Sequence, residues 1–358
     1  MKKTLYAIVS IALLGISSLT CHKKSNSAIQ LGSFAVLPVD LTYITGLVPL
    51  GNLNPPGHTF PTDHMYFYFS NQVTSFDLKS PGNLHVIQLV SQRMNPNQLD
   101  EKKDYTIILG SGSTRIRFAH VTQLQGKLLD AASNFSASVC ETTTIGGKQY
   151  EKCTLNVDVD VSAGELIGTI YTNVPGQFGF DLGIYVDNIP VCPLDYFDSA
   201  SRLQLISKLG SPDGLVKRTA EPLCGEVNQD ILGTLQGNWI QNGYDFYKES
   251  NNISFAKDAV EPNRLFLSIG DAGVLVPSGL YEVINIQSSG VIDRAFKDVK
   301  PDGKIYTYTV KVFESGVWKN RSILLRLEDN THLSLEARDV DANAVPYTFT
   351  AAKKSYHR

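Results

Sequence analysis

The fold is decided by residues 105–121, which read YTIILGSGSTRIRFAHV. Apolar and polar side chains alternate through residues 105–109 and again through 115–121, and the cluster of glycines and serines between them is typical of a turn. The segment therefore predicts two antiparallel strands joined by a short connection, each with one face in a core.

The same alternation recurs outward in both directions. It predicts further strands over residues 64–69, 84–89, 153–161, 166–171, 182–186, 265–269, 281–286, 305–313, 322–327 and 332–337. One convincing helix is expected near 198–209, with Asp198 or Ser199 capping its start. Because strands follow strands without helices between them, we expect an all-β fold of two antiparallel β domains with little helix.

Composition limits the class of protein. The 358 residues are 42% hydrophobic and 19% charged, which is long enough for two cores and too apolar for a disordered chain. The net charge is -3, with no basic excess, so no nucleic-acid partner is expected. Removing residues 1–20 also removes Lys2 and Lys3 and leaves -5, which argues against binding acidic polymers by charge.

The N-terminus predicts export. Residues 1–20 carry two early lysines and then a mostly apolar run that is too short to span a membrane, as in a signal peptide. Cys21 stands where a lipoprotein signal peptidase would cut, and we expect it to be acylated; the alternative is a secreted protein cut near Thr20. The predicted location is the bacterial cell envelope, on the outer membrane or a periplasmic face, with the lipid at Cys21 as membrane anchor.

Four cysteines remain after Cys21, and an even number in an exported chain favours disulfides. Cys140 and Cys153 flank a turn-rich segment and are expected to pair across a hairpin. Cys192 would then pair with Cys224 and close the segment between the two halves. Zinc binding by the four cysteines is the alternative, although no C-x2-C spacing is present.

A candidate metal site lies in the octapeptide GHTFPTDH, which ends at His64. His58, Asp63 and His64 offer two or three ligands to a tetrahedral zinc ion. In a strand starting at His64, its side chain shares a face with Tyr66 and Tyr68. The alternative is a turn in which these polar side chains bond to backbone groups.

Two later motifs carry a family resemblance. Phe118-Ala119-His120 and the segment AGELIG at 163–168 resemble, in order, the tyrosine-x-histidine strand and the glycine turn of lysostaphin-like zinc endopeptidases, peptidase family M23. The resemblance covers about residues 46–190. It implies a small antiparallel β-fold and an origin among enzymes that cleave peptide cross-links in cell walls.

The resemblance also implies roles for individual residues. His58 or His64 together with Asp63 stands in for the first pair of zinc ligands, although the spacing from His58 to Asp63 is one residue too long. His120 matches the catalytic histidine that assists the attacking water; otherwise it is a partly buried histidine bonded to backbone.

The family's H-x-H motif falls on Asp181-Leu182-Gly183, so both of its histidines are absent. Asp181 is a substitute metal ligand only if the local backbone shifts, and Gly183 has no side chain to offer. A catalytic zinc needs three protein ligands and one open position, so we favour a degenerate, non-hydrolytic domain.

In the second half, Gly237-Asn238-Trp239 resembles the Gly-x-Trp motif that opens lipocalin-like barrels. In those folds a late arginine packs over the tryptophan, and Arg326 or Arg338 is the candidate here. Simple core packing of Trp239 is the alternative. A ligand cavity in this barrel would add a transport function.

Together these observations predict a cell-envelope lipoprotein that binds or scaffolds without catalysis, on peptidoglycan peptide or another envelope protein, with no cofactor. The alternative is an active M23-type zinc metalloendopeptidase with His58, Asp63, His64 and His120 in a rearranged site. The expected organisation is a signal peptide (1–20), an acylated tether and lead-in (21–45), an M23-like β domain (46–195), a helix and disulfide-closed linker (196–227) and a β-barrel or sandwich (228–352).

Overall fold

The structure is a computed structural model that describes residues 29–70, 73–94, 104–145, 148–173, 178–246, 249–270, 276–314, 316–340, 342–343 and 347–358. Cys21 and residues 1–20 lie outside the described residues, so the predictions of a signal peptide and a lipid anchor have no structural counterpart. In the described part of the chain, no helix has the length and apolarity needed to cross a bilayer.

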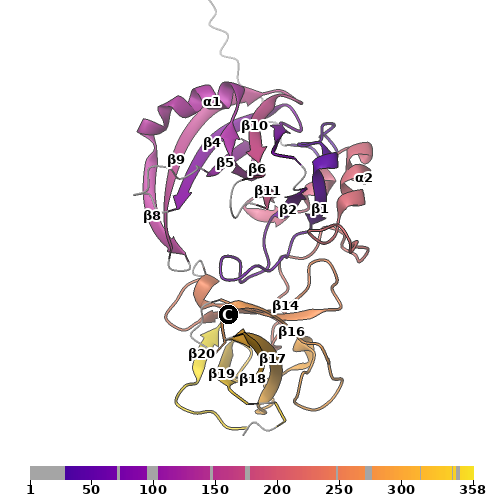
Figure 1. Ribbon diagram of the computed structural model, residues 1–358, viewed down its shortest axis with the longest axis vertical. Helices are drawn as coiled ribbons and strands as arrows, with labels where there is room; N and C mark the ends of the chain where they lie inside the picture. The colour runs from indigo at the N-terminus through magenta and orange to yellow at the C-terminus, as the bar shows by residue number, and fades with distance from the viewer. Residues whose placement is uncertain are drawn as a thin grey trace, which may run out of the picture.

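The first domain is built on one large, strongly curved sheet (Figure 1). All of its strand pairs are antiparallel. In spatial order the strands are β1 (Ile44–Val48), β2 (Met65–Phe69), β11 (Gly179–Val186), β6 (Thr114–Val121), β5 (Asp104–Ser111), β4 (Leu84–Met94), β9 (Lys148–Val161) and β8 (Val139–Ile145), with β12 (Ile189–Val191) beside β11.

A small second sheet and two helices complete the first domain. The sheet has the order β3 (Ser75–Lys79), β10 (Leu166–Tyr171) and β7 (Gln123–Leu124). The predicted helix is α2 (Ser199–Lys208), and Asp198 caps it by accepting a hydrogen bond from the Ser201 amide at 2.8 Å. A second, unpredicted helix, α1 (Gly126–Ala132), has a single buried side chain, Leu128.

The strands of residues 105–121 form as the alternation predicts. On β6, Ile116 and Phe118 are fully buried on the core side, while Arg115 and Arg117 are half-buried on the other. β6 pairs with β5 on one side and with β11 on the other, which places these arginines on the face opposite to the core. This polar face of the sheet carries the candidate site.

The second domain is a nearly closed barrel of eight antiparallel strands. Their order is β16 (Gly279–Glu282), β15 (Leu265–Ile269), β14 (Ile253–Lys257), β13 (Gly237–Gln241), β20 (Lys354–His357), β19 (His332–Arg338), β18 (Val317–Leu327) and β17 (Tyr306–Glu314). Short 3-10 helices occur at η1 (Leu41–Tyr43), η2 (Ser133–Ala137), η3 (Pro193–Tyr196), η4 (Glu249–Asn251) and η5 (Phe296–Asp298). The prediction of an all-β fold with antiparallel domains is confirmed.

Trp239 is fully buried in the barrel core, and a late arginine does pack over it. That arginine is Arg358, whose guanidinium carbon lies 3.8 Å from the centre of a Trp239 ring. Arg326 instead pairs with Glu328, and Arg338 pairs with Glu336, so neither fills the position expected for it. The reason is that β20, beyond the expected end of the domain, pairs directly with β13 and carries Arg358 to the tryptophan.

The two cores are separate, but their limits differ from the expected ones. The first core takes Phe34 and Ile44 from the expected lead-in and Leu205 from the expected linker. The second core extends to Tyr356. Apolar side chains thus bind the lead-in and α2 to the first sheet, because burial of each such side chain contributes about 1.5–3 kcal/mol.

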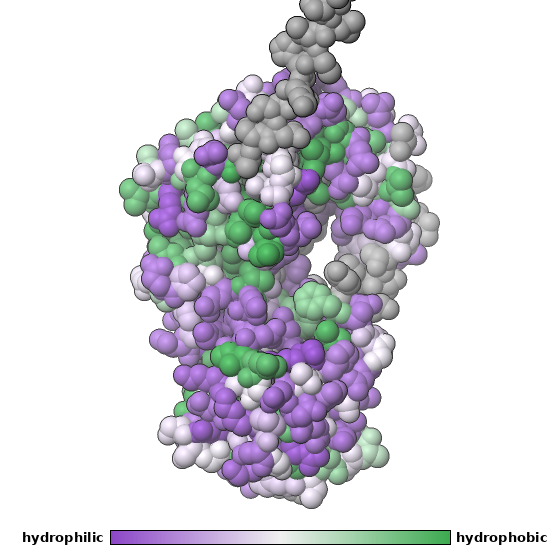
Figure 2. Space-filling model, turned by 180° about the vertical axis from the view of Figure 1, so that it is seen from behind, coloured by the Kyte–Doolittle hydropathy of each residue, from purple (hydrophilic) through white to green (hydrophobic). Residues whose placement is uncertain are grey.

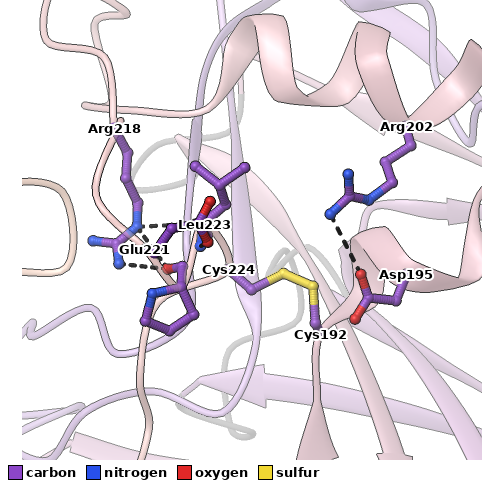
Figure 3. The surroundings of a disulfide bond; sticks show 8 residues. Cys192, Asp195, Arg202, Arg218, Glu221, Leu223 and Cys224 are labelled. Carbon is purple, nitrogen blue, oxygen red and sulfur yellow. Dashed lines mark hydrogen bonds and ion pairs between the residues drawn. A yellow bond between two sulfur atoms is a disulfide. The ribbon is translucent and has the colours of Figure 1, made fainter. Parts of the chain in front are cut away.

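Both predicted disulfides are present. Cys140 and Cys153 face each other across the β8–β9 hairpin, and Cys192 pairs with Cys224 after α2 (Figure 3). Beside the second disulfide, Arg218 donates to the carbonyls of Pro222 and Leu223 within the linker. Its Nη1 also donates to Ala259 O, so the linker connects the first domain to the barrel.

Candidate functional site

His64 lies immediately before β2 and is almost completely buried. Its Nδ1 donates to Asp63 Oδ1 at 2.8 Å, and its ring lies 4.7 Å from the ring of Tyr66, centre to centre. Burial raises the pKa of Asp63, but the hydrogen bond and charge of His64, together with the neighbouring Arg117 and Tyr185, lower it more, so the net pKa is below its ordinary value. Asp63 therefore stays ionised and fixes the orientation of the imidazole.

Asp181 is the centre of the site. β11 lies between β2 and β6, and its register places Asp181 opposite Tyr66 on one side and Ala119 on the other. The residue is 1% exposed, and its Oδ2 lies 3.3 Å from His64 Nε2 and 3.3 Å from His120 Nε2. One buried carboxylate thus lies 3.3 Å from two imidazoles that are distant in the sequence, although His64 Nε2 forms no hydrogen bond with the described residues.

His120 reaches Asp181 because β6 contains a bulge. Between the pairs Tyr105–Val121 and Ile107–Phe118, two residues of β6 oppose one residue of β5, and His120 has a φ of 63°. This left-handed conformation is uncommon for a residue with a side chain and costs of order 1–3 kcal/mol. The bulge places the imidazole over the polar face, where the surrounding contacts offset that strain.

The charge of His120 follows from its neighbours. Its Nδ1 donates to Asp104 Oδ2 at 2.7 Å, while its Nε2 faces Asp181. Burial lowers the pKa of His120, but the charge of Asp181 and the hydrogen bond to Asp104 raise it more, giving a pKa of about 9. His120 is therefore a cation at neutral pH, held between two carboxylates.

A second branch of the network runs along the sheet from Asp63. Tyr185 lies next to Asp63 and Arg117, close enough for both to affect the pKa of its hydroxyl. Burial, followed by the charge of Asp63, raises the pKa of Tyr185 to about 12, so its hydroxyl keeps its proton and acts as the donor. The polar face thus carries one connected set of side chains from Arg117 to Asp104.

His58 lies beside this network rather than within it. Its backbone closes a loop with Asn54 through two hydrogen bonds of 2.7 and 2.9 Å, and its ring lies 5.4 Å from that of His64. Burial and the neighbouring His64 lower the pKa of His58 to about 4, so it is neutral near pH 7. A neutral imidazole next to the network adds no charge to it.

The barrel holds the loop that carries His58. Phe60 packs against Phe246 with ring centres 5.0 Å apart, and the Phe60 amide donates to Glu249 Oε2 at 3.0 Å. The loop lies at the boundary of the two domains (Figure 1). From behind, the surface around this boundary carries hydrophilic side chains together with several hydrophobic ones (Figure 2). The second domain therefore helps to hold in place the loop that lies next to the site.

A small cavity opens onto Asp181. It has a volume of about 130 Å³ and is lined by Tyr66, Tyr68, His120 and Asp181, among others. Asp181 Oδ1 is buried and accepts no hydrogen bond from the described residues, so it remains an acceptor for a donor that enters the cavity. The cavity is large enough for a small polar group but too small for a sugar ring or a large side chain.

The family resemblance implies zinc, and the residues present do not fit the family's zinc site. The ligand position at 183 is a glycine, and a Cβ built there would lie 2.6 Å from Tyr185 Oη. Asp63 is already hydrogen-bonded to His64 and lies beside Tyr185. Within the described residues, no group of three or more His, Cys, Asp or Glu side chains is arranged to hold a metal ion.

The structure brings together most of the predicted site residues. His64, His120 and Asp181 meet directly, Asp63 bonds to His64, and His58 lies against the group without joining it. Sequence reasoning missed three participants, which are Asp104, Arg117 and Tyr185. The alternation within β6 and β11 is a signal that could have placed Arg117 and Tyr185 on the polar face, but it does not show that the two strands are neighbours.

Comparison with known proteins gives no relative. No protein-family model matches the chain, no curated protein matches its sequence, and no solved structure matches its fold.

Proposed function

We propose that this chain is a cell-envelope lipoprotein whose first domain is a degenerate M23-like fold that binds peptide without cleaving it. Peptidoglycan peptide is the ligand class we favour, and another envelope protein is the second. Acylation of Cys21 would anchor it, and the polar stretch after Cys21 would act as a tether.

The observation that carries the proposal is the filled position at residue 183. In the resemblance this position supplies a zinc ligand, but here Tyr185 lies over Gly183 and directs its hydroxyl to Asp63 and Arg117. The cationic His120 lies between the carboxylates of Asp181 and Asp104. A cavity of this kind offers hydrogen bonds and charge to a peptide group but no activated water.

The test is co-sedimentation of the purified protein with isolated peptidoglycan, followed by mass spectrometry of the soluble fraction. We expect the protein to sediment with the polymer and to release no new peptide fragments. Tyr68→Ala, which opens the cavity wall, should weaken sedimentation, whereas Tyr171→Ala, an exposed tyrosine on β10, should not.

Two results would contradict the proposal. Release of cross-link fragments by the wild-type protein, but not by a His120→Ala variant, would establish the peptidase alternative. Failure of the wild-type protein to sediment would remove peptidoglycan as the ligand and leave a protein partner.

A further inference from the structure

A second concave site lies on the polar face of the first sheet, beyond the Asp181 cavity. It is a cleft of about 380 Å³ whose lining includes Arg115, Arg117, Asn156, Tyr185 and Asn188. None of the eight residues that line it is acidic. The cleft therefore presents two cationic side chains and several amide groups to whatever enters it.

Two glycines make room for this cleft. A Cβ at Gly110 would lie 3.0 Å from Arg115 Nη1, and one at Gly183 would lie 2.6 Å from Tyr185 Oη. Arg115 and Tyr185 therefore lie across positions that have no side chain of their own. In the register, Arg115 stands opposite Gly110 on β5, and Arg117 stands opposite Gly183 on β11.

Both guanidinium groups are oriented but not neutralised. Arg115 Nη1 donates to the carbonyls of Gly112 at 2.8 Å and Thr114 at 3.0 Å, and Arg117 lies beside the Tyr185 hydroxyl. Among the described residues, neither arginine forms an ion pair. Each guanidinium has five N–H groups, so most of those on this pair remain for a ligand.

The amides add neutral donors. Gln88 donates from Nε2 to Asn156 Oδ1 at 3.1 Å, which leaves the Asn156 amino group as a donor. Planar guanidinium and amide donors match the two oxygens of a carboxylate, which accept bidentate hydrogen bonds. Asp63 and Asp181 lie close enough to Arg117 to raise its pKa. Their negative charges disfavour a dianionic ligand in the cleft more than a monoanionic one.

We propose that the cleft formed by Arg115, Arg117 and Asn156 is a subsite for the carboxylate group of a peptide. This inference deepens the proposed function and rests on it for the identity of the ligand as a peptide. Asp181 and Tyr185 are four residues apart on β11, or about 13 Å along the strand. A peptide whose carboxylate occupies the arginine cleft would therefore place a hydrogen-bond donor three or four residues away near Asp181.

The test uses protein carrying Cys21→Ser, so that no lipid interferes, labelled with 15N-arginine and titrated with two peptides by NMR. The probes are acetyl-Ala-Ala with a free carboxylate and the same peptide as its C-terminal amide. We expect the carboxylate form to shift the Nε–H signals of Arg115 and Arg117 and to bind at least about tenfold more tightly than the amide, because a charge-assisted pair is lost in the amide.

Variants locate the effect. Arg117→Gln should weaken binding of the carboxylate peptide by about tenfold or more, and Arg117→Lys should give an intermediate loss because an ammonium cannot form the bidentate pair. Arg202→Gln is the matched control, since Arg202 is 38% exposed on α2 and pairs with Asp195 away from the cleft. An unchanged melting temperature in each variant would show that the fold is intact.

Three results would overturn the inference: equal binding of the two peptides, no signal change at either arginine, or tighter binding of inorganic phosphate than of the peptide. These outcomes are separable from failure of the proposed function. If the Arg117→Gln variant sediments with peptidoglycan as well as the wild-type protein does, the proposed subsite is wrong while the proposed function stands. If the carboxylate peptide binds but peptidoglycan does not, the subsite stands and the ligand is another peptide.

Discussion

Replacing Asp181 by Asn should lower the pKa of His120. In the wild-type protein burial lowers this pKa, but Asp181 and then Asp104 raise it more, to about 9. Asn has nearly the same shape and removes the charge that lies 3.3 Å from His120 Nε2. Asp104 remains, and we expect the pKa to fall to between about 6 and 8, since an opposite charge this close shifts a pKa by about 1 to 3.

The assay is NMR titration of 15N-histidine-labelled protein, in which seven histidines give few signals and a His120→Gln variant assigns the one of interest. Asp160→Asn, which removes a carboxylate beside His85, is the matched control and should leave the pKa of His120 unchanged. A wild-type pKa near 6.5, or a value that Asp181→Asn does not change, would refute the arrangement of charges described here.

The same shift has a consequence for stability with a definite sign. The folded pKa of His120 lies above the value of about 6.5 in the unfolded chain, so its stabilisation is complete below about pH 6.5 and is lost as the pH rises through about 9. Because the His120 side chain is 43% exposed, solvent screening reduces the effect, and we expect about 1 to 2 kcal/mol. Denaturant unfolding between pH 6 and 10 should show this loss in wild type and much less of it in Asp181→Asn.

Two further predictions concern the barrel and the loop. Arg358→Ala removes the cation over Trp239 and the hydrogen bonds to the carbonyls of Thr234 and Gln236, and should lower the free energy of unfolding in urea by about 2 to 4 kcal/mol. Arg326→Ala is the control and should lower it by less than about 1 kcal/mol. Equal losses in the two variants would contradict the role of Arg358. His58, with a folded pKa of about 4, should contribute stability above about pH 6.5 that is lost as the pH falls through 4, and His58→Gln should flatten the acid side of the stability curve.

Much of the fold was predictable because alternation is a local property. Each strand of residues 105–121 shows its buried face in its own sequence, and the Cys140–Cys153 pair follows from a hairpin that closes locally. Helix α1 was missed because it has seven residues and buries one side chain, which is too little for a helical period to show. β20 was missed because only Tyr356 of its four residues is buried.

The site was predictable in its residue types and not in its connections. His64, His120 and Asp181 stood out as polar groups at strand ends and motif positions. Their convergence depends on β11 lying between β2 and β6, a pairing of strands distant in sequence. The contact between His120 and Asp104 depends further on the bulge at His120. The sequence does not mark this bulge, because residue 120 is neither glycine nor asparagine, the residues that usually adopt a left-handed backbone.

The central claim is that the polar centre around Asp181 is held by its own charges and hydrogen bonds and has no catalytic metal. The most direct measurement is the zinc content of protein purified without chelators, alongside a variant carrying His64→Ala and His120→Ala. We predict no stoichiometric zinc in either protein, with the wild type fully folded and the double variant less stable because Asp181 loses both imidazoles. About one zinc per chain in the wild type, lost in the double variant, would contradict the claim and favour the M23-type peptidase.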